Sequence, residues 1–114
     1  MHDELYHFDL YQDAAESTAV YPKKGDNLYY PALGLAGEAG EVCEKIKKIM
    51  RDQEGQLQPN NIQDLSKELG DVLWYVAALA SELNISMASI AEGNMLKLQD
   101  RSDRGVLRGS GDNR

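Results

Sequence analysis

The chain has 114 residues and a formal net charge of −7 at pH 7, with 42% hydrophobic and 27% charged residues. This length predicts one domain, and the composition predicts a soluble globular fold rather than a disordered chain. The acidic balance argues against binding of nucleic-acid polymers, which need basic patches. No stretch reaches the roughly 18 consecutive apolar residues of a membrane span, so we expect no membrane partner.

The N-terminus and the single cysteine indicate the compartment. The first ten residues, MHDELYHFDL, lack the basic and apolar regions of a signal peptide. Cys43 has no second cysteine with which to form an internal disulfide, which fits a reducing environment. We therefore expect the protein in the cytosol of a cell or of a virus-infected host.

Four helices and no strand are predicted. The first spans about residues 3–18 and leads into a loop, YPKKGDN, at residues 21–27, which is rich in turn-forming residues. The second spans about residues 28–51. Pro31 lies near its start, where the missing N–H of proline is tolerated.

The third helix is predicted to open at NNIQD, with Asn60 or Asn61 as its N-cap, and to end near Leu83. The fourth runs from about residue 86 and fades around residue 101. Residues 102–114 are rich in Gly, Arg and Asp and poor in apolar side chains. We expect them to form a tail or flap outside the core.

Apolar residues at spacings of three and four mark one face, or seam, on each of the two long helices. The seam residues are Leu35, Ala39, Val42, Ile46 and Ile49 on the second helix and Ile62, Leu65, Leu69, Val72, Val76, Leu79 and Leu83 on the third. Such seams pack helix against helix, and the short connection DQEGQLQPN makes the two antiparallel neighbours. We predict an all-α, four-helix bundle-like domain over residues 1–101.

Acidic residues recur beside both seams. At 100° per residue, Glu38 and Glu41 lie roughly 60° and 120° to one side of the seam of the second helix. Glu68 and Asp71 lie at about the same offsets, in the same sense, on the third helix. In an antiparallel pair these offsets fall on one flank, and the heights of the two pairs agree within about one helical turn. We therefore predict four converging carboxylates, with Glu44 on the opposite face and solvated.

Four converging carboxylates require compensation, either by protonation with raised pKa values or by a cation. Oxygen ligands without His or Cys favour Mg²⁺ or Mn²⁺ over zinc. A di-iron bundle would need Glu-x-x-His pairs, and His2 and His7 form none. Either acidic pair alone is common on exposed helices, so the prediction of a metal site depends on the matching offsets of the two pairs. Gly37, Gly40 and Gly70 flank the pairs, where they would admit a ligand or a neighbouring backbone.

The stretches LGLAGEAGEVCEKIKK and KELGDVLWYV resemble the MazG-like all-α nucleoside triphosphate pyrophosphohydrolases, which are marked by ExxE on one helix and ExxD on the next. The later GNMLKLQDR is similar to the Asn-x-x-Lys-x-x-x-Arg segment of that family. The likeness covers roughly residues 28–104. It points to the short, single-domain members common in bacteria and their phages.

The resemblance implies that Glu38, Glu41, Glu68 and Asp71 are catalytic and bind Mg²⁺, for which Mn²⁺ substitutes. It implies hydrolysis of a nucleoside triphosphate between the α and β phosphates, while the metal neutralises charge on the leaving pyrophosphate. Which carboxylate acts as general base stays open. The family also implies a homodimer or homotetramer, often with sites shared between subunits. A bundle this small, with acids on one flank, has little apolar surface left for stability as a monomer.

Two lysines of the second helix are candidates for substrate binding. Lys45 and Lys48 continue the acidic stripe toward the connecting loop at about the same helical angle. They would meet phosphate oxygens, or else form ordinary helical pairs with Glu41 and Glu44.

Three residues of the fourth helix form a second candidate group. Asn94 interrupts an apolar row, and Lys97 and Arg101 share its stripe, so the three would suit phosphates or sugar. Alternatively, Asn94 is structural, because most buried polar side chains are satisfied within the protein. In the tail, Arg104 and Arg108 would close over a bound triphosphate, or the tail is disordered without one.

Contacts to the base are predicted least sharply. The candidates are Tyr11, Gln12, Tyr29, Tyr30 and Trp74. Aromatic residues on bundle helices are more often part of a core or an interface. The leading interpretation is a Mg²⁺-dependent enzyme acting on canonical or modified (d)NTPs. The alternatives are a selective dUTP or dCTP pyrophosphatase of the same superfamily and a non-catalytic acidic helical adaptor for a basic partner.

Overall fold

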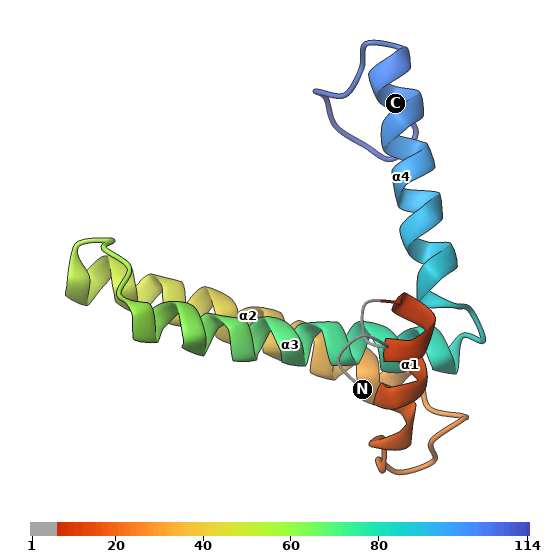
Figure 1. Ribbon diagram of the computed structural model, residues 1–114, viewed down its shortest axis with the longest axis horizontal. Coiled ribbons are helices and arrows are strands. Elements are labelled where there is room, and N and C mark those ends of the chain that lie inside the picture. Colours follow the sequence, from red (N-terminus) through yellow and green to blue (C-terminus); the bar gives the residue numbers. More distant parts are fainter. Residues whose placement is uncertain (1–6) are drawn as a thin grey trace.

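The computed structural model describes residues 7–114, so the predicted helix start at residues 3–6 lies outside the described residues. Four helices follow one another: α1 (Phe8–Ser17), α2 (Tyr29–Gln53), α3 (Pro59–Glu82) and α4 (Met87–Asp103) (Figure 1). The described part of the chain contains no strand, which confirms the all-α prediction.

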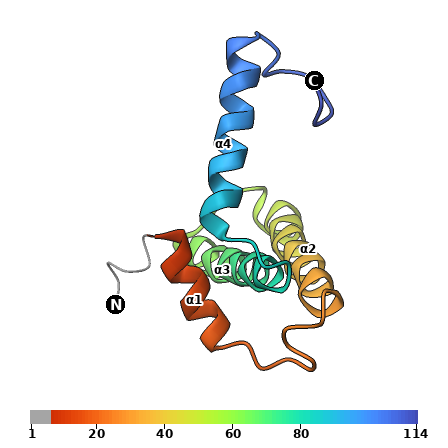
Figure 2. The same ribbon diagram turned by 90° about the vertical axis from the view of Figure 1, so that its right-hand side faces the viewer.

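Helices α2 and α3 form an antiparallel hairpin and lie side by side in both views (Figures 1 and 2). The turn between them begins at Glu54 and Gly55, whose φ angles are +54° and +77°. The N-cap of α3 is Gln58, so the prediction of Asn60 or Asn61 was wrong. Pro59 takes the first helical position because it lacks an N–H, and the side chain of Asn61 accepts a 2.8 Å hydrogen bond from the Gln58 N–H.

The main buried core lies at a corner where α1, the end of α3 and the start of α4 meet. Its buried apolar residues are Ala15, Ala77, Ala80 and Met87. The amide of Gln12 is buried there and joins three segments. It donates to Ser81 Oγ at 3.1 Å and to the Ile85 carbonyl at 3.0 Å, and it accepts from the Met87 N–H at 2.8 Å. Gln12 is therefore a structural residue of the corner, and a base contact for it is not supported.

Helix α4 extends away from this corner as an arm. Its axis is bent by 103° from that of α3, and the molecule measures 44 × 43 × 31 Å (Figure 1). Ser86 caps α4 by accepting a hydrogen bond from the Ser89 N–H, and the helix continues two residues beyond the predicted end at Arg101. Bundle packing is concentrated in α1, α2 and α3, while much of α4 is exposed.

The hairpin exposes one apolar flank. At 100° per residue, Met50 of α2 and Leu73 of α3 lie roughly 60–70° from the mean of their seams, on the side away from the acidic residues. Ile62 and Leu69, predicted as part of the α3 seam, lie toward the same side and are exposed. We call these four residues, which are 39–68% exposed, the apolar flank.

Among the described residues, no single helix has the length and apolar composition needed to cross a membrane. Of the helices in residues 7–114, α3 and α4 taken together, across their bend, pass such a test by length and composition.

Candidate active site

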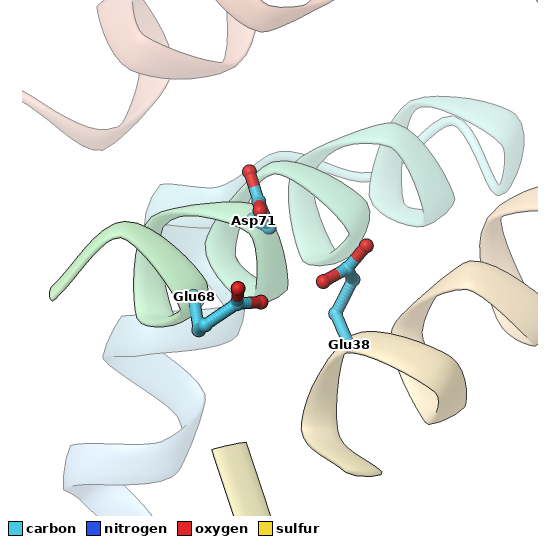
Figure 3. Close-up of side chains that lie close together, drawn as sticks. All are labelled: Glu38, Glu68 and Asp71. Carbon is cyan, nitrogen blue, oxygen red and sulfur yellow. The ribbon is translucent and has the colours of Figure 1, made fainter. Parts of the chain in front are cut away.

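Three carboxylates converge between the two hairpin helices. Glu38 projects from α2 toward Glu68 and Asp71 of α3, and one oxygen from each lies within 4.8 Å of the others (Figure 3). Glu38 and Glu68 are half-buried and Asp71 is exposed. The antiparallel hairpin thus brings together one acid of the first predicted pair and both acids of the second.

The three acids disturb one another electrostatically. Partial burial raises the pKa of Glu38, and so do a hydrogen bond with the Glu68 carboxyl and the negative charge of Asp71. The direction of this pKa shift is the one that an excess of negative charge produces. A divalent cation bound among the three carboxylates would relieve that excess.

Glu41 lies one helical turn beyond Glu38 and is exposed. It is not among the three acids with converging oxygens, although its negative charge also raises the pKa of Glu38. Glu44 points elsewhere and pairs with Lys47 at 2.9 Å and with Lys48 at 3.9 Å, which lowers its pKa. The structure therefore gives Lys48 a helical ion pair away from the cluster.

Lys45 is drawn into the cluster by two acids of α3. Its Nζ lies 2.9 Å from Asp64 Oδ2 and 3.1 Å from Glu68 Oε1. The predicted alternative, an ordinary pair with Glu41, is not what forms. Asp64 was missed by the sequence analysis, although it precedes Glu68 by one helical turn and so shares its stripe.

The predicted substrate residues of α4 lie on the arm. Within this chain the structure does not bring Asn94, Lys97 or Arg101 to the carboxylates (Figure 1). Asn94 is exposed. Lys97 Nζ lies 3.3 Å from Asp112 Oδ1, and Arg101 Nη2 donates to the Asp112 carbonyl at 2.7 Å. The tail thus folds back on α4 and engages both cations.

A hollow of about 230 Å³ is lined largely by aromatic rings, one of which, Tyr75, comes one helical turn after Asp71 on α3. Tyr21 and Tyr30 stack with centroids 4.8 Å apart, and Trp74 meets Tyr75 edge-on at 5.0 Å. Burial raises the pKa of Tyr75 most, and Tyr30 and the negative charges of Glu38 and Asp71 raise it further. The hollow is therefore close enough to the acids to sense their charge.

Sequence reasoning named only half of these rings. Tyr30 and Trp74 were among its candidates for base contact, whereas Tyr21 and Tyr75 were not. Tyr75 follows directly after Trp74. The sequence feature that could have pointed to Tyr75 is Gly34 on α2, one turn before Glu38, because a glycine leaves room for a large ring. A Cβ at Gly34 would overlap the Tyr75 ring, so the ring occupies the space that glycine leaves open.

The three glycines expected to admit a close approach have no such neighbour in this chain. A Cβ added at Gly37, Gly40 or Gly70 would meet nothing within 4 Å. The space beside these glycines is therefore open to a ligand or to another chain.

Comparison with known proteins decides the family. The sequence model of the MazG nucleotide pyrophosphohydrolase domain matches residues 31–106, two thirds of the chain. The chain belongs to the MazG nucleotide pyrophosphohydrolase family. The matched segment contains Glu38, Glu41, Glu68 and Asp71. This match confirms the family resemblance and the prediction of a nucleoside triphosphate pyrophosphohydrolase.

A phage protein is similar over nearly its whole length. The Gene 37 protein of Mycobacterium phage L5 is 51% identical over 113 residues, which cover 95% of this chain and 99% of that protein. No solved structure shows significant similarity.

Proposed function

We propose that this MazG family member hydrolyses (d)NTPs between the α and β phosphates, in the presence of Mg²⁺, to give the (d)NMP and pyrophosphate. The observation that carries the proposal is the convergence of Glu38, Glu68 and Asp71 from adjacent helices to within 4.8 Å. An acidic adaptor would not need three carboxylates at one point. Family membership also favours catalysis over the adaptor alternative.

The residues of the cluster fit a hard divalent ion. All three ligands are carboxylates, and oxygen ligands suit Mg²⁺ or Mn²⁺. Glu38, Glu68 and Asp71 would hold the ion, and Glu41 would join them through a change of rotamer from the next turn of α2. When bound, Mg²⁺ supplies charge neutralisation at the phosphates.

Other residues of the chain would place the nucleotide. Lys45, already at the edge of the cluster, would contact the phosphates, with Lys48 one turn further on. The hollow between Tyr21, Tyr30 and Trp74 would stack the base, because aromatic faces are natural partners for bases. A defined base pocket favours the narrower alternative, a pyrophosphatase selective for a nucleotide such as dUTP or dCTP.

The active form is proposed to be a homodimer or homotetramer. The apolar flank of the hairpin exposes large side chains, among them Met50 at 68%, and water-exposed patches of this kind mark interfaces. A neighbouring copy would then bring Asn94, Lys97 and Arg101 of its α4 to the site. Sedimentation velocity at tens of micromolar checks this, and a monomer there would contradict it.

The cytoplasm of a bacterial or phage-infected cell is the proposed location. Cys43 is a free thiol, and the similar protein described above comes from a phage. Nucleoside triphosphates are abundant in that compartment.

The activity is tested by incubating the protein with each NTP and dNTP, with and without Mg²⁺. Pyrophosphate and the monophosphate should form only with the metal, and addition of a chelator should stop the reaction. Release of inorganic phosphate and a diphosphate would overturn the choice of bond. A preference for one base of tenfold or more would support the selective alternative, since aromatic stacking with edge contacts discriminates at that level.

A further inference from the structure

One cation lies against the proposed metal ligands. The Lys45 ammonium sits between Asp64 and Glu68, at 2.9 Å and 3.1 Å. The side chain of Glu68 is 17% exposed and that of Lys45 is 28% exposed, so this pair is better shielded from water than most surface ion pairs. A positive charge therefore already neutralises part of the cluster.

This inference rests on the proposed metal site. We propose that the Lys45 ammonium competes with the divalent ion for Glu68 in the free protein. The competition ends when the phosphates of a bound triphosphate accept hydrogen bonds from Lys45 instead. The free protein then binds metal weakly. The protein with a nucleotide binds metal tightly, so the metal and the nucleotide are taken up together.

The competition follows from charge and distance. An ammonium that donates to Glu68 Oε1 occupies a lone pair of the carboxylate, and its positive charge repels a second cation at the same group. A Mg²⁺ ion approaches its oxygen ligands to about 2.1 Å, so the two cations cannot share that oxygen without strong repulsion. Binding of the metal must therefore move Lys45.

Two features give the displaced ammonium somewhere to go. Asp64 remains as a partner when Glu68 is released, because the ammonium contacts both acids. Lys45, Lys48 and Asp64 also line a hollow of about 160 Å³ beside the hairpin. Phosphate oxygens entering this hollow would meet both lysines and draw Lys45 from the metal ligand.

Binding of the two ligands is then reciprocal. If a nucleotide raises the affinity for metal by some factor, the metal must raise the affinity for nucleotide by the same factor. Part of this factor is the release of Lys45 from Glu68. Removing the ammonium should therefore strengthen metal binding to the free protein and weaken the coupling.

The experiment measures Mn²⁺ binding to the full-length protein without nucleotide, by the loss of the free Mn²⁺ signal in electron paramagnetic resonance. Lys45→Met should tighten binding roughly two- to fivefold, the upper part of the range expected for a surface ion pair. Lys45→Arg keeps the charge and should stay near the wild-type affinity. Lys47→Met removes an equal charge that is paired with Glu44 and should also change little.

Binding of an α,β-methylene deoxynucleoside triphosphate, measured with and without Mn²⁺, tests the coupling. The enhancement by metal should be smaller in Lys45→Met than in the wild type by about the same factor. Unchanged or weaker Mn²⁺ binding in Lys45→Met, while the wild type binds Mn²⁺ and Glu68→Gln loses that binding, would overturn the inference alone. Mn²⁺ binding that is absent, or insensitive to Glu68→Gln, would overturn both the inference and the proposed metal site.

Discussion

The α2–α3 hairpin and the α4 arm both carry candidate site residues, but they place them differently. The hairpin brings Glu38, Glu68 and Asp71 together through packing within one chain. The arm carries Lys97 and Arg101 away from that point and keeps large apolar side chains exposed along its length. In the proposed site, three acids thus come from one chain, whereas the α4 residues would come from a second copy.

The acids should be indispensable, which is the largest expected effect. Glu38→Gln and Asp71→Asn should each lower kcat at least about a hundredfold, because each removes a charged ligand from the metal. Glu41→Gln should do the same if Glu41 joins the metal as proposed. Initial rates of pyrophosphate release measure the loss, and far-ultraviolet circular dichroism should show unchanged helix content.

Glu44→Gln is the matched control on the same helix. Its carboxylate pairs with Lys47 on another face, so activity should stay near that of the wild type. Full activity of Glu41→Gln would restrict the metal site to the three acids that already converge. Full activity of Glu38→Gln would contradict the site itself.

The arm is tested by mixing two weakened variants. Lys97→Glu places a negative charge where a phosphate is expected, and Glu38→Gln disables the metal site. If α4 serves the neighbouring subunit, a mixed dimer of these variants contains one intact site. Equal mixing should then restore about a quarter of wild-type activity, because half of the dimers are mixed. Mixtures that stay as weak as the separate variants would place the two residues in one subunit's site or take Lys97 out of it.

The same contrast explains what the sequence predicts. Seam spacing and helical offsets are local properties, so they correctly predicted the antiparallel hairpin and the meeting of Glu38 with Glu68 and Asp71. Glu41 shares this stripe, but its angle is further from the seam, and it stays exposed outside the converging three. The angular offset of a residue from the seam does not by itself predict whether its side chain still reaches the facing helix.

Tertiary contacts were not readable in this way. The polar break in the α4 pattern at Asn94 was visible in the sequence. The 103° bend between α3 and α4 was not, and it lies at the corner where the buried Gln12 amide accepts a hydrogen bond from the Met87 N–H. Lys45 forms its ion pairs with Asp64 and Glu68 of the facing helix and not with an acidic residue of its own helix. Periodicity describes one helix at a time and does not rank such cross-helix partners.

Glycine-to-alanine substitutions should change the free energy of unfolding in opposite directions in the hairpin and in the α4 arm. Gly34→Ala should lower the free energy of unfolding by about 1–3 kcal/mol, because its Cβ would overlap the Tyr75 ring. Gly93→Ala, on the arm, meets nothing within 4 Å and should raise it by roughly 0.5–1 kcal/mol through helix propensity. Urea unfolding followed by circular dichroism measures both. Loss of stability in Gly93→Ala would show that α4 is closely covered in the assembly.

The smallest effect concerns the loop that leads into the hairpin. Glu82, at the end of α3, accepts hydrogen bonds from Asn27 N–H at 2.8 Å, from Gly25 N–H at 2.7 Å and from the Tyr21 hydroxyl. The bond from Asn27, then that from Tyr21, lowers the pKa of Glu82 below its usual 4.5. The folded state therefore favours the carboxylate. This contribution to stability is full above about pH 4.5 and is lost as the pH falls through the folded-state pKa.

Glu82→Gln should accordingly cost about 1 kcal/mol at pH 7, the low end for bonds to a charged group because the site is partly exposed. The cost should shrink as the pH falls below 4.5 and through the folded-state pKa of Glu82, where the wild-type carboxyl becomes protonated and loses its charge. Urea midpoints of both proteins across this range measure the difference. If the substitution cost the same at pH 7 and at the acidic end of the range, Glu82 would hold the loop through its packing and neutral hydrogen bonds and not through its charge. In that case packing alone would stabilise the loop against the hairpin, and the negative charge of Glu82 would contribute nothing to the free energy of unfolding.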